Sequence, residues 1–408
     1  MAKNEKLVVG LDIGTTKICA VVGEVNPEGV NIVGIGTHPS VGLRKGVVVN
    51  IESTVESIKR AVEEAELMAG CEINSVYVGI AGGHVQGFNS HGVIAVKNRE
   101  VTQQDIDRVI DAAQAVAIPF DREVIHILAQ EYIIDDQRGI QNPLGMSGVR
   151  LEAKVHIVTG AVTSAQNIVR CCNRSGLDVC DIVLESLASA ESVLTPQERQ
   201  LGVALVDFGG GTSDLAIFSD ISIRHSSVLA LGGNNLTTDI AVGLRTPMEE
   251  AEKIKLRYGC ALTSMIEKDE TIQVPSVGGG NSRVLSRQIL GEILEPRVEE
   301  VCSMLHRELI RSTLSDLVAS GLVITGGSAM LPGLGDVAEQ IFNMPVRTGM
   351  PQRVGGLVDV VNNPMYATGV GLTLYGAKSR PKKLFRIRQN NIFNRLVDRM
   401  RRWFRDIA

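Results

Sequence analysis

Two stretches of the sequence join an aspartate to a glycine turn and hydroxyl side chains, and this combination suits phosphate binding. In each stretch an apolar segment ends on the aspartate, and a second apolar segment follows the turn. The first stretch carries Asp12, Gly14, Thr15, Thr16 and Lys17, and the second carries Asp207, Gly209, Gly210, Gly211 and Thr212. Glycine lets backbone N–H groups approach phosphate oxygens, while threonine hydroxyls and lysine add donors and charge. Each stretch alone is compatible with an ordinary β-hairpin, but their recurrence predicts a duplicated α/β domain with a nucleotide between its halves.

The two aspartates of these stretches are expected to face one another across the cleft. Two carboxylates beside a polyphosphate suit a hydrated Mg²⁺, which keeps several waters and takes few protein ligands. Asp12 and Asp207 are therefore predicted to act on Mg²⁺ mainly through water. No G-x-x-x-x-G-K-[ST] motif occurs in the sequence, so the site is not a P-loop.

A third glycine turn and an acidic residue are further candidates. An apolar run leads into Gly326, Gly327, Ser328 and Met330, where close backbone approach suits an adenosine sugar or α-phosphate. Alone, this turn is compatible with any strand-to-helix loop. Glu185 lies between a predicted strand and a predicted helix, where a carboxylate can orient a water at a γ-phosphate. Complementarity to the positive end of the helix is an equally good explanation for Glu185.

The elements that position these motifs are predicted to form two halves and an insertion. In the first half, strands are expected at 7–13, 17–25, 30–38 and 75–80. The segment 84–160, whose helix is expected to start after Thr102 and run towards Ala117, is interpreted as a small α+β insertion. In the second half, a hairpin through 278–281 is expected to lead into a helix that runs to Ser315.

Composition limits the class of protein. A chain of 408 residues with 44% hydrophobic content can bury a large core and is expected to hold two or more domains. The seven cysteines show no C-x-x-C spacing and are interpreted as reduced thiols, which argues against a disulfide framework or a zinc site. The opening residues lead straight into a strand and are not expected to be a signal peptide. No apolar run approaches the roughly 18 residues that a transmembrane helix needs.

The end of the chain differs in charge from the rest. From Lys378 to Ala408 there are eleven basic and two acidic residues, whereas the remaining chain holds 30 basic and 44 acidic ones. After a basic linker over 377–390, a helix is predicted over 391–408, with apolar residues on one side and polar residues on the other. The apolar side comprises Ile392, Phe393, Leu396, Val397, Met400, Trp403, Phe404 and Ile407, and the polar side includes Arg395, Arg399 and Arg402.

A basic amphipathic helix with bulky apolar residues is suited to lie in the plane of an anionic membrane surface. Each basic side chain near such a surface contributes on the order of 1 kcal/mol. The position of this helix at the chain end, after a basic linker, favours membrane binding. The alternatives are a helix docked on its own globule and a helix that enters a groove of a partner protein.

The order of the three glycine motifs is similar to that of the actin–Hsp70–sugar-kinase superfamily, and the whole chain resembles the FtsA family of bacterial cell-division proteins within it. The resemblance implies an α/β fold of the actin/Hsp70 type, duplicated around a cleft, with a 1C-type insertion and a C-terminal amphipathic membrane-targeting helix. It also implies these subdomains: 1A over 1–83 and 161–196, 1C over 84–160, 2A over 197–231 and 304–376, and 2B over 232–303.

Residue roles follow from the resemblance where the motifs match. Phosphates are expected at Gly14, Thr15, Thr16, Lys17, Gly210, Gly211 and Thr212. Adenosine is expected at Gly326, Gly327, Ser328 and Met330. The run 246–249 has the pattern of a capping box with Pro247 as the first helical residue, and in related ATPases such a helix contacts adenine and ribose. Its candidates are Glu250, Lys253 and Arg257, for which a solvated charged face is the alternative.

FtsA proteins tether FtsZ filaments to the cytoplasmic membrane, polymerise and recruit later division proteins. The resemblance therefore implies ATP and Mg²⁺ as ligands, with hydrolysis that is slow at most and with Glu185, Asp12 and Asp207 as its candidate catalytic groups. The implied partners are the FtsZ C-terminal peptide at subdomain 2B, other copies of the chain, later division proteins and anionic phospholipid, but no nucleic acid. The implied location is the inner face of the cytoplasmic membrane at the division septum, as a peripheral protein.

Three other functions share parts of this pattern. An Hsp70-type chaperone needs a peptide-binding domain after the nucleotide clamp, for which the chain beyond Gly376 is too short. A sugar kinase needs a catalytic Asp base beside a phosphoacceptor pocket, and no candidate stands out. An adaptor of type IV pilus assembly shares the core and the insertion but is not expected to carry a terminal amphipathic helix.

Overall fold

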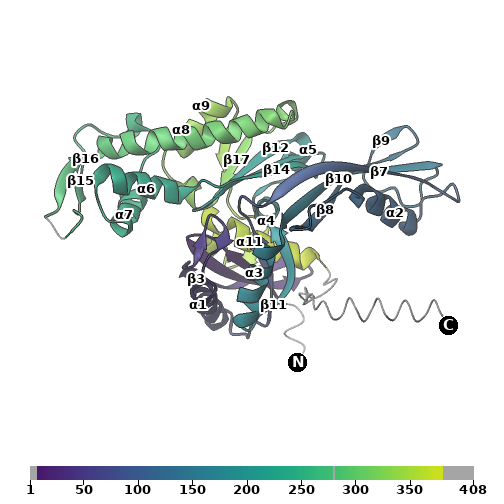
Figure 1. The fold of residues 1–408 in the computed structure, drawn as a ribbon, viewed down its shortest axis with the longest axis horizontal. Helices are drawn as coiled ribbons and strands as arrows, with labels where there is room; N and C mark the ends of the chain where they lie inside the picture. Colours follow the sequence, from purple (N-terminus) through teal and green to yellow (C-terminus); the bar gives the residue numbers. More distant parts are fainter. Residues whose placement is uncertain (1–6, 279–280, 380–408) are drawn as a thin grey trace.

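Two sheets of matching topology and a third, smaller sheet organise the chain (Figure 1). The computed structural model describes residues 7–278 and 281–379. The predicted helix over 391–408 lies outside these residues, as does the linker beyond Ser379. None of the helices in the described part of the chain is long and apolar enough to cross a membrane.

The first sheet has the strand order β11-β6-β1-β2-β3-β19. Strands β1, β2 and β3 are successive antiparallel neighbours, while β6 runs parallel to β1 and β11 parallel to β6. Its strands are β1 (Leu7–Ile13), β2 (Lys17–Asn26), β3 (Gly29–Pro39), β6 (Ser75–Ile80), β11 (Asp178–Leu184) and β19 (Val354–Gly356). The strands predicted in the first half are thus confirmed within a residue at most ends.

Helices cover both faces of this sheet, which explains why its strands are almost continuously apolar. Its helices are α1 (Ile51–Ala69), α3 (Val162–Arg174), α4 (Glu185–Val193) and α11 (Ala367–Lys378). Helix α11 packs against α4 and β1, and its last residue, Lys378, forms an ion pair with Glu191 of α4. The first half therefore ends in a buried helix that leads directly to the tail.

The second sheet repeats the plan of the first, with the order β14-β13-β12-β17-β18. Strands β12, β13 and β14 are again successive antiparallel neighbours, and β17 runs parallel to β12 as β6 does to β1. The strands are β12 (Val203–Phe208), β13 (Ser213–Ser219), β14 (Ser222–Leu229), β17 (Leu322–Thr325) and β18 (Val346–Thr348). Its helices are α5 (Pro196–Leu201), α8 (Arg287–Arg311) and α9 (Leu334–Phe342). The predicted duplication is therefore visible in the strand topology.

The insertion forms its own sheet, in the order β7-β10-β8-β9, with one helix packed on β7 and β10. Its elements are β7 (Gln86–Ala95), α2 (Gln103–Gln114), β8 (Arg122–Ile134), β9 (Gln137–Ile140) and β10 (Arg150–Ala161). Thr102 caps α2 as predicted, through a reciprocal capping box with Asp105. The helix ends at Gln114, before the predicted Ala117, because the chain turns into an exposed loop there.

A small helical part projects from the second half. It comprises α6 (Gly233–Leu244), α7 (Met248–Tyr258) and the hairpin of β15 (Thr271–Val274) and β16 (Arg283–Ser286). The predicted capping box at 246–249 is wrong: Pro247 is the N-cap, and no side chain caps α7. Helix α8 ends at Arg311, before the predicted Ser315, where a separate turn begins. The remaining short elements are β4 (Leu43–Arg44), β5 (Val47–Val48) and α10 (Val358–Val361).

Candidate functional site

The glycine turns of the two halves lie directly against one another. A Cβ atom added at Gly210 would lie 1.9 Å from Thr16 Oγ1, and one at Gly211 would lie 2.4 Å from Thr15 Oγ1. Both distances are far below van der Waals contact, so only glycine fits at these two positions. The hydroxyl of Thr16 also donates a hydrogen bond across the cleft to Asn234 Oδ1, at 3.3 Å. The two hairpins recognised in the sequence therefore form one site.

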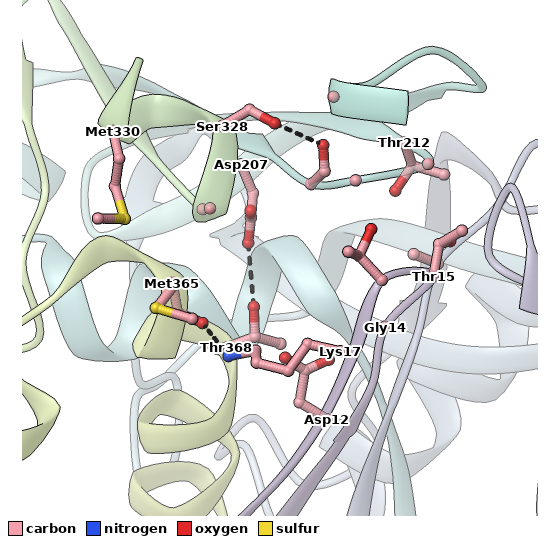
Figure 2. Close-up of a pocket in the computed structure, with 18 of the residues that line it drawn as sticks. Asp12, Gly14, Thr15, Lys17, Asp207, Thr212, Ser328, Met330, Met365 and Thr368 are labelled. Carbon is pink, nitrogen blue, oxygen red and sulfur yellow. Dashed lines mark hydrogen bonds between the residues drawn. The ribbon is translucent and has the colours of Figure 1, made fainter. Parts of the chain in front are cut away.

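A cavity of about 420 Å³ lies between these turns, and Figure 2 shows how side chains from both halves surround it. Its volume is within the range of small-molecule sites. Fourteen of the seventeen residues singled out in the sequence for nucleotide chemistry line it: Asp12, Gly14, Thr15, Thr16, Lys17, Glu185, Asp207, Gly210, Gly211, Thr212, Gly326, Gly327, Ser328 and Met330.

The two predicted aspartates are buried on the cavity wall. Asp207 accepts hydrogen bonds on Oδ2 from the hydroxyls of Ser189, at 2.5 Å, and Thr368, at 3.1 Å. Burial raises the pKa of Asp207, and these two hydrogen bonds oppose the shift. Burial also raises the pKa of Asp12 to about 6, with Lys17 lowering it and Asp207 raising it. The two carboxylates thus sense one another's charge, as expected for neighbours across the cleft.

Two further carboxyl groups lie in the same region. Glu185 is the first residue of α4, and its side chain packs over Gly79, where an added Cβ would lie 2.9 Å from its Cγ. Burial raises its pKa, and so do Asp12, Asp214 and Asp207. Asp214 pairs with Asp207 across the β12–β13 ladder, and burial followed by the charge of Asp207 raises its pKa to about 8. Asp214 could have been noticed in the sequence, because it is a charged residue in a largely apolar strand that follows the glycine turn.

Lys17 brings the cation of the first motif to the cavity. Its Nζ donates a hydrogen bond to the carbonyl oxygen of Met365 at 2.6 Å (Figure 2). The same Nζ lies 4.4 Å from the ring centroid of Tyr366. Met365, in the turn just before α11, and Thr368, in the first turn of α11, also line the cavity, although no motif marked them. This segment therefore contacts both the lysine of the first half and Asp207 of the second.

Helix α7 turns a different face to the cavity from the one predicted. Glu250, Lys253 and Arg257 do not line it; Lys253 instead forms a surface ion pair with Glu250 at 2.7 Å. The lining residues of α7 are Glu252, Lys255 and Leu256. Helix α7 buries Ala251 and Ile254, and the residues that follow these two, Glu252 and Lys255, face the cavity.

Lys255 is the cation on this wall. Its Nζ donates to Thr237 Oγ1 at 2.8 Å, to Glu252 Oε2 at 2.7 Å and to the carbonyl oxygen of Gly233 at 3.1 Å. These contacts fix Lys255 against the N-terminal end of α6. The polar residues that α7 presents to the cavity are therefore Glu252 and Lys255, on the face next to the predicted one.

The third glycine turn closes the cavity from the second half. Gly326 has φ +86°, and an added Cβ would lie 2.3 Å from Asp207 Oδ1, so both its conformation and its surroundings require glycine. Ser328 Oγ donates to the carbonyl oxygen of Gly209 at 3.0 Å and thereby links the third turn to the second (Figure 2). Met330 extends beside the cavity with about half of its surface exposed. All three predicted turns thus meet around one space.

The chemistry of this site fits a polyphosphate with a hydrated divalent cation. Three buried carboxyl groups, of Asp12, Asp207 and Asp214, and the half-buried one of Glu185 influence one another's pKa values. Among the described residues, the buried Oδ1 of Asp214 has no hydrogen-bond partner. A bound cation would favour the ionised form of such groups. No cluster of three or more His, Cys, Asp or Glu side chains suited to direct metal binding occurs within 7–278 and 281–379.

The raised pKa of Asp214 predicts an effect on stability. A carboxyl group with a raised pKa binds its proton more tightly in the folded than in the unfolded state, so its contribution is present at low pH and is lost as pH rises through the folded value of about 8. We expect the free energy of unfolding, without nucleotide or divalent cation, to fall between pH 6 and pH 7.5. The slope from one such group approaches about 1.4 kcal/mol per pH unit.

Urea unfolding of Asp214→Asn at pH 6 and pH 7.5 tests this expectation. The neutral amide removes the titrating group, so the variant should lose less stability over this interval than the unaltered protein. Asp336→Asn, on the exposed side of α9, is the matched control and should keep the original slope. An unchanged slope in Asp214→Asn would show that this carboxyl group is ionised in the folded protein.

Comparison with known proteins places the chain among cell-division proteins by sequence. A family model described as "Cell division protein FtsA" matches residues 204–371, and one described as "SHS2 domain inserted in FTSA" matches residues 82–159. The chain is 58% identical over 376 residues to the cell division protein FtsA of Pseudomonas aeruginosa, covering 92% of this chain and 90% of the relative. It is 45% identical over 386 residues to that of Escherichia coli K12, covering 93% and 92%.

Solved structures show the same fold at much lower identity. The match to a structure titled "PilM-PilN type IV pilus biogenesis complex" has a TM-score of 0.66 at 15% identity and covers 91% of this chain and 99% of that chain. The match to MreB5 of Spiroplasma citri bound to ADP has a TM-score of 0.56 at 15% identity, with 91% and 96% covered. The predicted duplicated fold of the actin type is confirmed.

Proposed function

The chain belongs to the FtsA family of cell division proteins, and we propose that it binds ATP in the cleft and attaches FtsZ filaments to the cytoplasmic membrane. The observation that carries the nucleotide proposal is the direct apposition of two glycine turns around a cavity lined by Asp12, Lys17 and Asp207. The membrane proposal is supported by the amphipathic and basic pattern of residues 391–408.

Each group of lining residues receives a role in this proposal. The backbone and hydroxyl groups of the two hairpin turns, with Lys17, hold the phosphates, and Asp12 and Asp207 hold Mg²⁺ through water. Gly326, Ser328 and Met330 hold adenosine. On α7, Lys255 and Glu252 replace the residues first chosen from the sequence as polar contacts of the nucleoside. When bound with ATP, Mg²⁺ supplies charge neutralisation at the phosphates.

Hydrolysis, in this proposal, is slow and depends on Glu185. The carboxyl group of Glu185 lines the cavity, so it is placed to orient a water towards a terminal phosphate. Its raised pKa, caused by burial and three neighbouring aspartates, keeps it protonated over a wider pH range than an exposed glutamate. A protonated carboxyl group is a poor base, which agrees with binding as the main role of the site.

The adaptor role assigns a surface to each partner. We assign the C-terminal peptide of FtsZ to the small subdomain over 232–303, and later division proteins to the insertion over 84–160. Other copies of the chain would stack end to end in filaments of the actin type, with ATP closing the cleft and biasing the orientation of subdomains 1A, 1C, 2A and 2B. The protein would act at the inner face of the membrane, at the division septum.

Vesicle flotation tests the membrane role. We expect the full chain to float with anionic vesicles and a chain truncated after Gln389 to remain at the bottom of the gradient, because truncation removes the whole predicted helix. Raising the salt concentration should weaken flotation of the full chain, since the basic residues act through screened charge.

Neutral vesicles serve as the control for charge, and ATP binding by the truncated chain serves as the control for folding. If neither chain floats while both bind ATP, the helix packs on the globule or on a protein partner. A pilus-type adaptor would then become the better description. If both chains float, the membrane contact lies elsewhere on the molecule.

A further inference from the structure

The insertion contacts both halves of the molecule, and this double attachment has consequences for the cleft between them. Its chain connections run to the first half, through the segments before β7 and after β10. Its strands β7, β8 and β10 also contact β14 of the second half. Figure 1 shows the insertion beside the junction of the two halves, next to β14, with β11 lower in the view.

Contact with the first half is firm. The backbone N–H of Leu184, at the end of β11, donates a hydrogen bond to Nε2 of His126 on β8 at 3.0 Å. Val85 and Val158, at the base of the insertion, belong to a hydrophobic core that comes mainly from the first half and also includes Phe218 and Ile223 of the second half. His126 is buried, and burial lowers its pKa to about 4, so it is a neutral acceptor at physiological pH. The insertion therefore moves with the first half.

Contact with the second half is a polar network on the edge strand β14. His156 of β10 is fully buried; its Nδ1 donates to Asn89 Oδ1 at 2.7 Å, and its Nε2 accepts from Ser226 Oγ at 2.8 Å. Asn89 of β7 also donates to the carbonyl oxygen of Arg224 at 3.1 Å. Two strands of the insertion, β7 and β10, thus direct side chains at one strand of the second half.

Gln130 of β8 completes this network. Its Nε2 donates to the carbonyl oxygens of Ile223, at 2.8 Å, and Arg224, at 3.3 Å, and to Asn89 Oδ1 at 3.2 Å. Its backbone carbonyl accepts from Ser222 Oγ at 3.1 Å. Gln130, His156 and Ser226 are buried, whereas Asn89 is exposed. The three buried groups hold a single arrangement, because leaving any of them without a partner is costly.

Side chains do not completely fill the junction between the insertion and β14. Next to it lies a second cavity, of about 460 Å³, walled by β14, by the start of β7 and by the last turn of α8. At the rim of this cavity an added Cβ on Gly87 would lie 2.4 Å from Ser226 Oγ, so the two strands approach closely there. The insertion can therefore separate from β14 without breaking the hydrogen bonds within either sheet.

We propose that the network of Asn89, Gln130, His156 and Ser226 holds the insertion to the second half and thereby sets the rate of nucleotide exchange. We call this network the brace. The two halves form the walls of the cleft. The insertion is fixed to the first half by its chain connections, and this network, together with a shared apolar core, holds it to the second half. Widening the cleft to release a ligand therefore strains or breaks the network. The inference rests on the proposed nucleotide binding at the cleft.

Dissociation kinetics of a fluorescent ATP analogue test the brace. The full-length protein is loaded with the analogue and Mg²⁺ and then mixed rapidly with excess unlabelled ATP. Gln130→Ala removes the side-chain hydrogen bonds to β14, and we expect dissociation to be about fivefold to tenfold faster, since one lost hydrogen bond changes an equilibrium about fivefold. Ser226→Ala removes the hydroxyl that the second half contributes to the same network, and it should also make dissociation faster.

Two matched variants serve as controls. Gln137→Ala changes an exposed glutamine on β9 of the same insertion, and Ser227→Ala changes the neighbouring hydroxyl on β14, outside the network. Both should leave the dissociation rate unchanged. Unchanged or slower dissociation in Gln130→Ala and Ser226→Ala, with normal thermal melting, would overturn the brace. Absence of any ATP binding by the unaltered protein would instead overturn the proposed function of the cleft, and the inference with it.

Discussion

Substituting Gly211 by aspartate should reduce ATP affinity by at least about 100-fold, which corresponds to about 2.7 kcal/mol. Two effects act together at this position. Any side chain at Gly211 collides with Thr15 of the opposite turn, because even a Cβ would lie 2.4 Å from its hydroxyl oxygen. The added carboxylate also repels phosphate in a region where Asp12, Asp207 and Glu185 already lie. Equilibrium titration with a labelled nucleotide measures the change.

Gly335→Asp is the matched control for this substitution. A Cβ at Gly335 meets only Ile324 at 3.9 Å, which is ordinary contact, and an aspartate in the first turn of α9 complements the helix dipole. The control should bind nucleotide with unchanged affinity. If Gly211→Asp binds as tightly as the unaltered protein, the phosphates do not lie between the two turns, and the assignment of the cleft fails.

Substituting Trp403 by glutamate should weaken binding to anionic vesicles by at least about tenfold while ATP affinity stays unchanged. The substitution removes a large apolar side chain, which contributes roughly 2 kcal/mol or more when buried, and puts a negative charge next to anionic lipid. Trp403 lies outside the described residues, so this expectation rests on the sequence pattern alone. Flotation and nucleotide titration on the same preparation give both readouts.

Asn394→Glu is the control for charge in this experiment. It introduces the same negative charge on the predicted polar side of the helix and should weaken vesicle binding far less than Trp403→Glu. Equal losses for both substitutions would mean that net charge alone governs binding and that the helix does not insert an apolar side. Joint loss of vesicle and ATP binding would mean that the tail forms part of the folded globule.

The glycine turns could be predicted from the sequence because their chemistry is local. A glycine between two apolar strands signals a close approach or an unusual backbone angle, and a hydroxyl beside it signals hydrogen bonding. Gly211 and Gly326 bear this out, since each has a neighbour that excludes any side chain. The repetition of the motif then predicted that two turns from distant parts of the chain meet, and the structure brings them into contact.

Other residues of the site could not be predicted from the sequence, because their positions depend on how helices pack. The face that α7 turns to the cavity is decided by burial of Ala251 and Ile254, and no local feature of the sequence distinguishes Lys255 from Lys253. Thr368 belongs to a buried helix with no polar pattern, so nothing local marks its hydroxyl as a partner of Asp207. The contact of His156 with Ser226 likewise follows only from the docking of two sheets.

Helix α11 connects the wall of the cavity directly to the start of the tail. Its first turn reaches Asp207 through Thr368, and the carbonyl of Met365 just before it holds Lys17. Its last residue, Lys378, contacts Glu191 and is followed by the tail. A pulling force applied to the chain beyond Ser379 therefore enters the folded part at this helix and arrives at the cavity wall within about 18 Å, the length of twelve residues of α-helix. Tension between a tethered tail and a filament held at the other half would act on the same atoms that surround the cleft.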